Sequence, residues 1–323
     1  INIVTLNPVK TNKTSFHTTI GDLQTRNAQL RHSGTVGNLN FSTSVNYRYN
    51  EGFPRLSLQE DPRPFDKIED TNEALHLLVK GIYAPSLYDT LEFQIGVGES
   101  TIKVPDGDPS GDQKGYNTRE FENNFQLIRW IHNQPSNNQT HLQFYHNRLK
   151  TNELRKLGPL SDILGVPPEF IPFIFDGHPD EEITTGLEDT LSERYDLEFQ
   201  QKLNLTESQR LVWGIGARYD RMQGEFLLSR DDTVDEIQYR LFANWEWCFH
   251  ENWTANIGAM AEHNSIIGDL VSPRAAVNYA LTPNHTFHAS YTYGNRTPSI
   301  LEANQFQGVR FADGTLIEAD VIF

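Results

Sequence analysis

The feature that most constrains the fold is a period-two alternation of apolar and polar side chains that recurs along most of the chain. Its clearest example runs through residues 39–50, where residues such as Phe41 and Tyr47 alternate with polar residues such as Ser44 and Arg48. Alternation of this kind places the two sets of side chains on opposite faces of a β-strand. We therefore predict an all-β chain of antiparallel strands with one apolar and one polar face.

The length of the alternating segments indicates where these strands reside. They run roughly 9–13 residues, close to the ~9–11 that a tilted strand needs to cross hydrocarbon and longer than the ~5–6 common in soluble proteins. The mean hydropathy is −0.55 and no stretch approaches the roughly 20 apolar residues of a membrane-spanning helix. Barrel strands are apolar on one face only, so a transmembrane β-barrel is compatible with this low hydropathy.

The connections between the predicted strands alternate between short turns and loops that are often long. The short set comprises Ser33–Asn38, Ala84–Asp89, Gln134–Asn138, Thr206–Ser208, His250–Asn252 and Thr282–Asn284. The other set comprises Glu51–Asn72, Ser100–Thr118, Thr151–Glu188 and Gln223–Val234. This sorting is typical of outer-membrane barrels, in which the short turns are periplasmic and the long loops extracellular.

Two details of the strands give further expectations. Aromatic residues such as Tyr47, Trp245, Trp253 and Tyr291 lie near segment ends, which indicates girdles at the two membrane interfaces. Residues 121–133 break the alternation around Arg129 and Trp130, and we interpret this break as a β-bulge.

Composition excludes several other classes. A net charge of −16 argues against a nucleic-acid-binding protein. The single cysteine, Cys248, excludes an intrachain disulfide and a zinc site built on several thiolates. Residues 106–112 resemble the start of a calcium loop, but Asn117 occupies the position that requires glutamate. We expect no metal, no cofactor and, because nucleotide-binding and serine-hydrolase motifs are missing, no catalytic residue.

Motifs toward the C-terminal end carry a resemblance to a known family. Ser272-Pro273-Arg274 opens a predicted strand, Thr282-Pro283-Asn284 forms the turn after it, and Arg296-Thr297-Pro298-Ser299 follows the next strand. This order resembles TonB-dependent outer-membrane receptors. Residues 1–5 are similar to the segment that closes the plug domain of that family, and residues 26–34 are similar to its first barrel hairpin.

The resemblance implies a barrel of about 22 strands with a plug in its lumen. This chain would supply about thirteen strands, or fourteen if Thr315–Phe323 is one. Residues 1–8 would be the end of the plug domain and its lead-in. Residues 9–323 would be the N-terminal and central part of the barrel, and we expect a fragment cut at both ends rather than a natural C-terminus at Phe323.

The resemblance also implies a function. Such receptors reside in the outer membrane of Gram-negative bacteria, where they bind a siderophore-iron complex, haem, a cobalamin or a glycan. They import it with energy from TonB, which would contact plug residues absent from this chain, so the expected partners are TonB, a small nutrient and outer-membrane lipid. A passive outer-membrane channel or adhesin is the first alternative, and a soluble β-rich glycan hydrolase is the second.

Four arginines share the polar phase of their strands and are the candidate luminal residues: Arg48, Arg218, Arg240 and Arg274. Inside a barrel they would either pair with acidic wall or plug residues or line the path of an anionic substrate, and pairing is the favoured role. The acidic residues Asp231, Asp232, Asp235 and Glu236 are expected to be solvated loop charge. The family motif adds Ser272, Pro273, Arg296, Thr297 and Pro298 as residues of interest.

Overall fold

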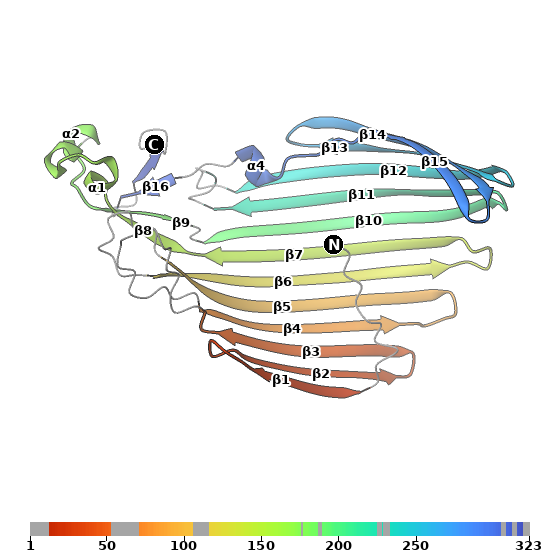
Figure 1. Cartoon of the computed structure of the whole chain (residues 1–323), viewed down its shortest axis with the longest axis horizontal. Helices are drawn as coiled ribbons and strands as arrows, with labels where there is room; N and C mark the ends of the chain where they lie inside the picture. Colours follow the sequence, from red (N-terminus) through yellow and green to blue (C-terminus); the bar gives the residue numbers. More distant parts are fainter. Residues whose placement is uncertain are drawn as a thin grey trace.

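A large antiparallel sheet dominates the structure (Figure 1). The computed structural model describes residues 13–52, 71–105, 116–175, 177–186, 189–224, 228, 233–304, 308–311 and 315–318. Thirteen strands form the sheet and follow chain order, except that β7 pairs with β10. They are β1 Thr14–Ile20, β2 Arg26–Val36, β3 Leu39–Asn50, β4 Asn72–Tyr83, β5 Asp89–Pro105, β6 Tyr116–Asn133, β7 Gln139–Asn152, β10 Thr190–Thr206, β11 Gln209–Gln223, β12 Val234–His250, β13 Trp253–Asn264, β14 Gly268–Thr282 and β15 His285–Thr292.

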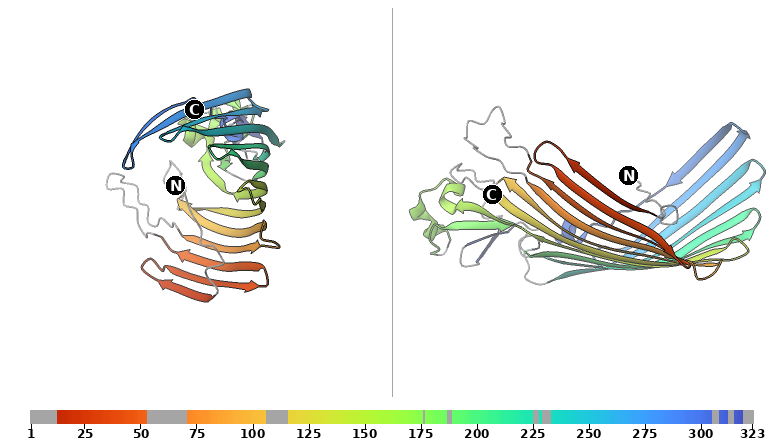
Figure 2. Two further views of the ribbon diagram at one scale, coloured as in Figure 1. Left: turned by 90° about the vertical axis from the view of Figure 1, so that its right-hand side faces the viewer. Right: turned by 90° about the horizontal axis from the view of Figure 1, so that it is seen from below.

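The sheet curls into an open trough, as the end-on view in Figure 2 shows. Its edges are β1 and β15, so within the described residues the wall does not close on itself. This confirms the predicted partial barrel. The described part of the possible fourteenth strand, β17 (Leu316–Glu318), joins a second, smaller sheet instead. Residues 1–8, the predicted end of a plug, lie outside the described residues.

The strand register explains why alternation in sequence becomes two chemically different faces. Directly opposed residues of an antiparallel pair point to the same side. Leu197 is opposite Ala217, and Asp196 is opposite Arg218, so an apolar row lies beside a charged row. The apolar row is exposed, with Leu197 at 49% and Leu241 at 54%. A barrel in a bilayer keeps its apolar residues outward, which assigns the polar face to the lumen.

The predicted bulge in β6 is wrong. The strand pairs with β5 and β7 in unbroken register through Arg129 and Trp130. The alternation looks broken because both faces of this strand carry apolar residues. On the luminal face the ring of Phe125 lies over Gly96, which has no side chain to occupy that space.

Several strands are longer than a membrane crossing requires. β5, β10 and β12 have 17 residues each and β6 has 18, against the ~9–11 needed for hydrocarbon. The surplus lies toward the long loops, where charged residues also occupy the outer phase, with Glu99 opposite Glu122 and Glu122 opposite Lys150. The wall therefore projects beyond the bilayer on the extracellular side.

Aromatic residues on the outer face differ between the two ends of the wall. The loop ends carry tyrosines such as Tyr195 and Tyr219, whose ring centroids are 6.1 Å apart. At the turn ends, Trp253 stacks on Tyr279 at 4.4 Å. The strand registers place every tryptophan of the chain on the outer face near the short turns: Trp130, Trp213, Trp245, Trp247 and Trp253.

A second, four-stranded sheet forms on the extracellular side from two distant stretches of chain (Figure 1). The β7–β10 connection contributes β8 (Leu154–Pro159), α1 (Leu160–Leu164), η2 (Pro168–Phe170), α2 (Ile171–Ile174) and β9 (Glu182–Gly186). The segment after β15 contributes β16 (Gly308–Arg310) and β17. We call this unit the extracellular sheet. No helix in the described ranges is long and apolar enough to cross a membrane.

The extracellular sheet has its own apolar core, which joins the two stretches. Phe311, 3% exposed, lies edge-on to Phe175 with ring centroids 6.0 Å apart and stacks on His178 at 4.1 Å. Arg310 of β16 is opposite Thr184 of β9. The other buried members of the core are Leu160, Ile171 and Ile183.

Glycines on the luminal face leave space for atoms of the neighbouring strands, and one of them gives a testable prediction. A Cβ added at Gly214 would lie 2.6 Å from the Phe199 carbonyl oxygen on β10 and 2.5 Å from the Phe242 ring. We expect Gly214→Ala to destabilise the wall by about 1–3 kcal/mol, because a neighbouring backbone must shift. Equilibrium urea unfolding of the protein in lipid vesicles measures this. The control is Gly294→Ala, where nothing lies within 4 Å of the added Cβ, and equal midpoints for both variants would contradict the prediction.

Candidate functional site

After β15 the chain leaves the wall and turns onto the luminal face. We call residues 293–304, which include α4 (Ile300–Asn304), the luminal strap. Its first part still follows β14: the Asn295 backbone N–H donates to the Ser272 hydroxyl at 3.2 Å, and the Asn295 side chain donates to the Val271 carbonyl at 2.9 Å. Ile300 is buried at 6% exposure. The strap is thus fixed at its beginning to β14 and at its helix by apolar burial.

A capping box orders the turn of the strap. The Ser299 backbone N–H donates to the Glu302 carboxylate at 2.8 Å, and the Glu302 N–H donates to the Ser299 hydroxyl at 3.2 Å. This reciprocal pattern satisfies two free N–H groups at a helix start. Arg296 donates to both oxygens of Glu302, at 3.2 and 2.8 Å. Arg296 and the Ser299 N–H together hold the pKa of Glu302 below its ordinary value.

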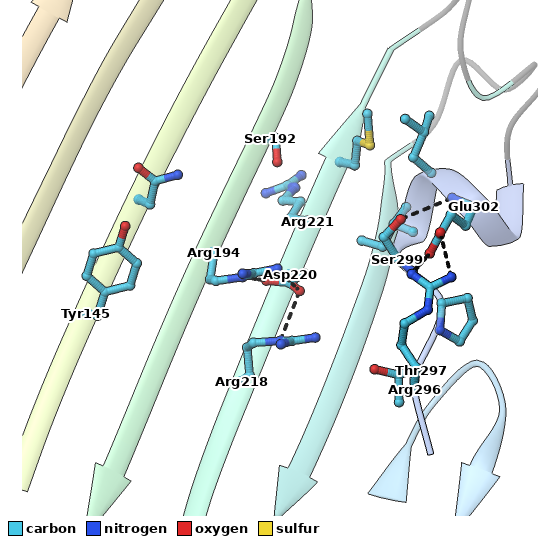
Figure 3. Close-up of a pocket in the computed structure, with 15 residues that line it drawn as sticks. Tyr145, Ser192, Arg194, Arg218, Asp220, Arg221, Arg296, Thr297, Ser299 and Glu302 are labelled. Atoms are coloured by element: carbon cyan, nitrogen blue, oxygen red, sulfur yellow. Dashed lines mark hydrogen bonds and ion pairs between the residues drawn. The ribbon is translucent and has the colours of Figure 1, made fainter. Parts of the chain in front are cut away.

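The wall opposite the strap carries a charged cluster centred on Asp220 (Figure 3). Arg194 of β10 donates to both Asp220 oxygens, at 2.7 and 3.0 Å. Arg218 approaches the same carboxylate at 3.1 Å and reaches Glu236 at 3.5 Å. Asn264 donates to Glu236 at 2.5 Å. Since Asp220 and Glu236 are buried, the guanidinium groups compensate carboxylates that would otherwise be costly to desolvate.

A second luminal cluster is built around Arg240. Its guanidinium reaches across β11 to β10, where it binds Asp196 at 2.8 Å and Glu198 at 2.9 Å. It can do so because Gly216 lies beneath it: an added Cβ there would be 2.5 Å from the Arg240 Nε. His141 of β7 lies 3.5 Å from Glu198. The cluster therefore links β7, β10 and β12.

A polar cavity of about 580 Å³ lies between the strap and the wall. We call it the strap cavity. The labelled side chains in Figure 3 show that β7, β10 and β11 supply one side and the strap the other. The lining of the cavity includes Tyr145, Asn147, Ser192, Arg194, Arg218, Asp220, Arg296, Thr297, Ser299 and Glu302. A separate apolar hollow, lined by residues such as Leu197 and Ile215, opens on the outer face and belongs to the lipid boundary.

The structure places the four candidate arginines on the luminal phase but does not bring them together. Arg218 and Arg240 belong to the two charged clusters described above. Arg48 lies on β3 and Arg274 on β14, far apart in the order of the sheet. Both are exposed, and neither forms a hydrogen bond or ion pair with any residue in the described part of the chain.

The family-motif residues lie close together. Ser272 and Pro273 accept the hydrogen bonds that hold the start of the strap on β14, from the N–H groups of Asn295 and Tyr293. Thr297 and Pro298 line the strap cavity beside Arg296. The two motif pieces, separated by a hairpin in sequence, are therefore neighbours that together position the strap.

Sequence reasoning did not single out Arg194, Asp220 or Glu302 as residues of this site. Arg194 shares the polar phase with Asp196 two residues later, so alternation alone could have identified it. The Ser299-x-x-Glu302 spacing is a recognisable capping-box signal.

One of the expectations about the acidic residues is wrong, and two of these residues lie outside the described part of the chain. Glu236, expected to be solvated loop charge, is 1% exposed within the luminal cluster, because it lies inside β12, where Arg218 and Asn264 bind its carboxylate. Asp235 accepts a hydrogen bond from the Tyr219 hydroxyl at 2.9 Å. Asp231 and Asp232, like the calcium-like stretch at 106–112, lie outside the described residues.

Comparison with known proteins identifies the family to which this architecture belongs. A family model described as the TonB-dependent receptor-like β-barrel matches residues 81–316. No curated protein matches the sequence. Among solved structures, the siderophore receptor PirA of Acinetobacter baumannii is 12% identical with a TM-score of 0.61, over 88% of this chain and 43% of that one. PirA of Pseudomonas aeruginosa is 12% identical with a TM-score of 0.59, over 89% and 43%.

A third similar structure is the ferric enterobactin receptor PfeA of Pseudomonas aeruginosa, 14% identical with a TM-score of 0.58 over 88% of this chain. The chain spans less than half the length of each of these proteins. At such identities the structures establish the shared fold, and the family model covers most of the chain. The chain belongs to the TonB-dependent receptor β-barrel family, whose members lie in the outer membrane of Gram-negative bacteria.

Proposed function

We propose that this chain is part of an outer-membrane receptor that binds a scarce nutrient and imports it with energy supplied by TonB. The observation that carries the proposal is the polar strap cavity, which lies on the luminal side of the wall and toward its extracellular end. A nutrient arriving from outside would meet this cavity early on its path through the lumen. The role is binding and transport, without covalent chemistry.

Chelated iron is the first nutrient class to test. PirA and PfeA are titled as siderophore and ferric enterobactin receptors, and this supports a ferric siderophore as the ligand here. Another structure of the same fold is titled a peptide importer, so the fold alone does not choose the cargo. We also propose that residues 1–8 end a plug domain and that residues 9–323 belong to the barrel, with TonB acting through plug residues.

Uptake by intact cells tests the proposal. Cells that carry the complete reading frame should accumulate labelled iron from at least one ferric siderophore, and cells without TonB should not. The control is a strain from which the receptor has been deleted, measured with the same panel of haem, cobalamin and siderophores. Equal uptake with and without TonB would instead indicate a passive channel and would overturn the proposal.

A further inference from the structure

We propose that the strap cavity binds an anionic, oxygen-rich group of the imported ligand, a carboxylate or a phosphate, through Arg194 of the wall and Arg296 of the strap. The inference rests on the proposed function in one respect, because it takes the occupant to be the imported nutrient.

The acceptors in the cavity are already used. Both oxygens of Asp220 bind Arg194, and one of them also faces Arg218 at 3.1 Å. Both oxygens of Glu302 bind Arg296, and one also accepts from the Ser299 N–H. Each carboxylate is therefore satisfied by groups of the protein itself and has little capacity left for a ligand donor.

The donors, in contrast, are in surplus. Arg194 uses Nε and Nη2 for Asp220, which leaves its Nη1 group without a hydrogen bond among the described residues. Arg296 uses both terminal nitrogens for Glu302 and leaves Nε. The two side chains are 47% and 79% exposed, so these N–H groups are accessible to a ligand. A guanidinium has five N–H donors and no acceptor, so it seeks oxygen from any ligand that enters.

Neutral polar groups surround the two arginines. Tyr145, Asn147, Ser192 and Thr297 line the cavity, and their side chains form no hydrogen bond within the described part of the chain. They can bind the remainder of a polar ligand, and three of them are hydroxyls that either donate or accept.

Formal charge alone does not select the ligand. When Glu236 and Asp235 are counted with Asp220 and Glu302, four carboxylates balance Arg194, Arg218, Arg221 and Arg296. What favours an anion is the strength of the bonds: a charged donor bonding a charged oxygen makes a hydrogen bond about twice as strong as a neutral pair. A neutral sugar would use the hydroxyl and amide groups but gain less from the free guanidinium N–H groups.

The test is calorimetric titration of the purified, intact receptor with citrate, inorganic phosphate and, as a neutral probe, sucrose. We expect citrate or phosphate to bind and sucrose to bind more weakly. Arg194→Gln should weaken binding of the anion about tenfold or more, because it removes a charged donor. The matched control is Arg210→Gln: Arg210 is also luminal, pairs with Glu246 at 2.8 Å and is 46% exposed, but lies away from the cavity.

A second variant keeps the test valid if Arg194→Gln unfolds the wall. Arg296→Gln changes an exposed strap residue outside the wall and should weaken anion binding by a similar factor. Anion affinity that is unchanged in both variants, or lost equally in Arg210→Gln, would overturn the inference, as would tighter binding of sucrose. TonB-dependent uptake without anion binding would remove this inference and leave the proposed function intact. Anion binding without TonB-dependent uptake would support this inference and overturn the proposed function.

Discussion

Replacing Phe311 with alanine is expected to destabilise the extracellular sheet by about 3–5 kcal/mol, the usual cost of deleting a buried aromatic ring. The ring is 3% exposed in a core with Ile171, Phe175 and Ile183, and it is a residue that the C-terminal stretch contributes to that core. Its loss leaves a cavity and removes the stack on His178. The β7–β10 connection should then open frequently while the barrel wall stays folded.

Trypsin added to intact cells measures this opening, since the sequence of the β7–β10 connection contains Arg155 and Lys156, after which trypsin cleaves. When opening and closing are fast, the cleavage rate follows the population of the open form, so a rise of at least about a hundredfold is expected. The control is Phe173→Ala in the same connection, where the side chain is 86% exposed and little change is expected. Indistinguishable cleavage of the two variants would show that Phe311 does not join the two stretches.

Replacing Asp220 with alanine is the second large effect, with an expected loss of about 3 kcal/mol of wall stability. The carboxylate is shared by Arg194 and Arg218, so one substitution leaves two guanidinium groups without their principal partner. Breaking a pair from one side costs most where the remaining charge stays desolvated, and here that charge is Arg218, whose side chain is 21% exposed.

Urea unfolding in lipid vesicles measures that loss. Glu246→Ala is the matched control: it also removes a luminal carboxylate from one arginine, but the pair is partly exposed, with side chains 46% and 29% accessible. A loss below about 1 kcal/mol is expected there. Should both variants shift the midpoint equally, the Asp220 cluster would contribute no more than an ordinary surface pair.

The wall was predictable because its information is local. Alternation places Leu197 outward and Arg218 inward wherever the strand lies in the sheet, and the short turns impose the neighbour of each strand. The apparent break at Arg129 failed as a signal because a residue on another strand, Gly96, makes room for Phe125. The sequence pattern of a single strand does not reveal a contact with a residue on another strand.

The site was only partly predictable, because its contacts depend on register and on long-range packing. Arg194 meets Asp220 only once β10 and β11 pair in a particular register. Phe311 meets Phe175 across a long stretch of chain, in segments without periodicity. The capping box at Ser299 is readable from sequence, but its position against the wall is not.

The one-sided placement of the tryptophans has a consequence for spectroscopy. Because all five lie on the outer face near the short turns, the intrinsic fluorescence of this chain reports on the inner leaflet of the outer membrane. Brominated lipids labelled in that leaflet should quench it, and quenchers confined to the cell exterior should not. Events at the strap cavity or the extracellular sheet will leave the emission almost unchanged, so a reporter for ligand entry must be introduced at the other end of the wall.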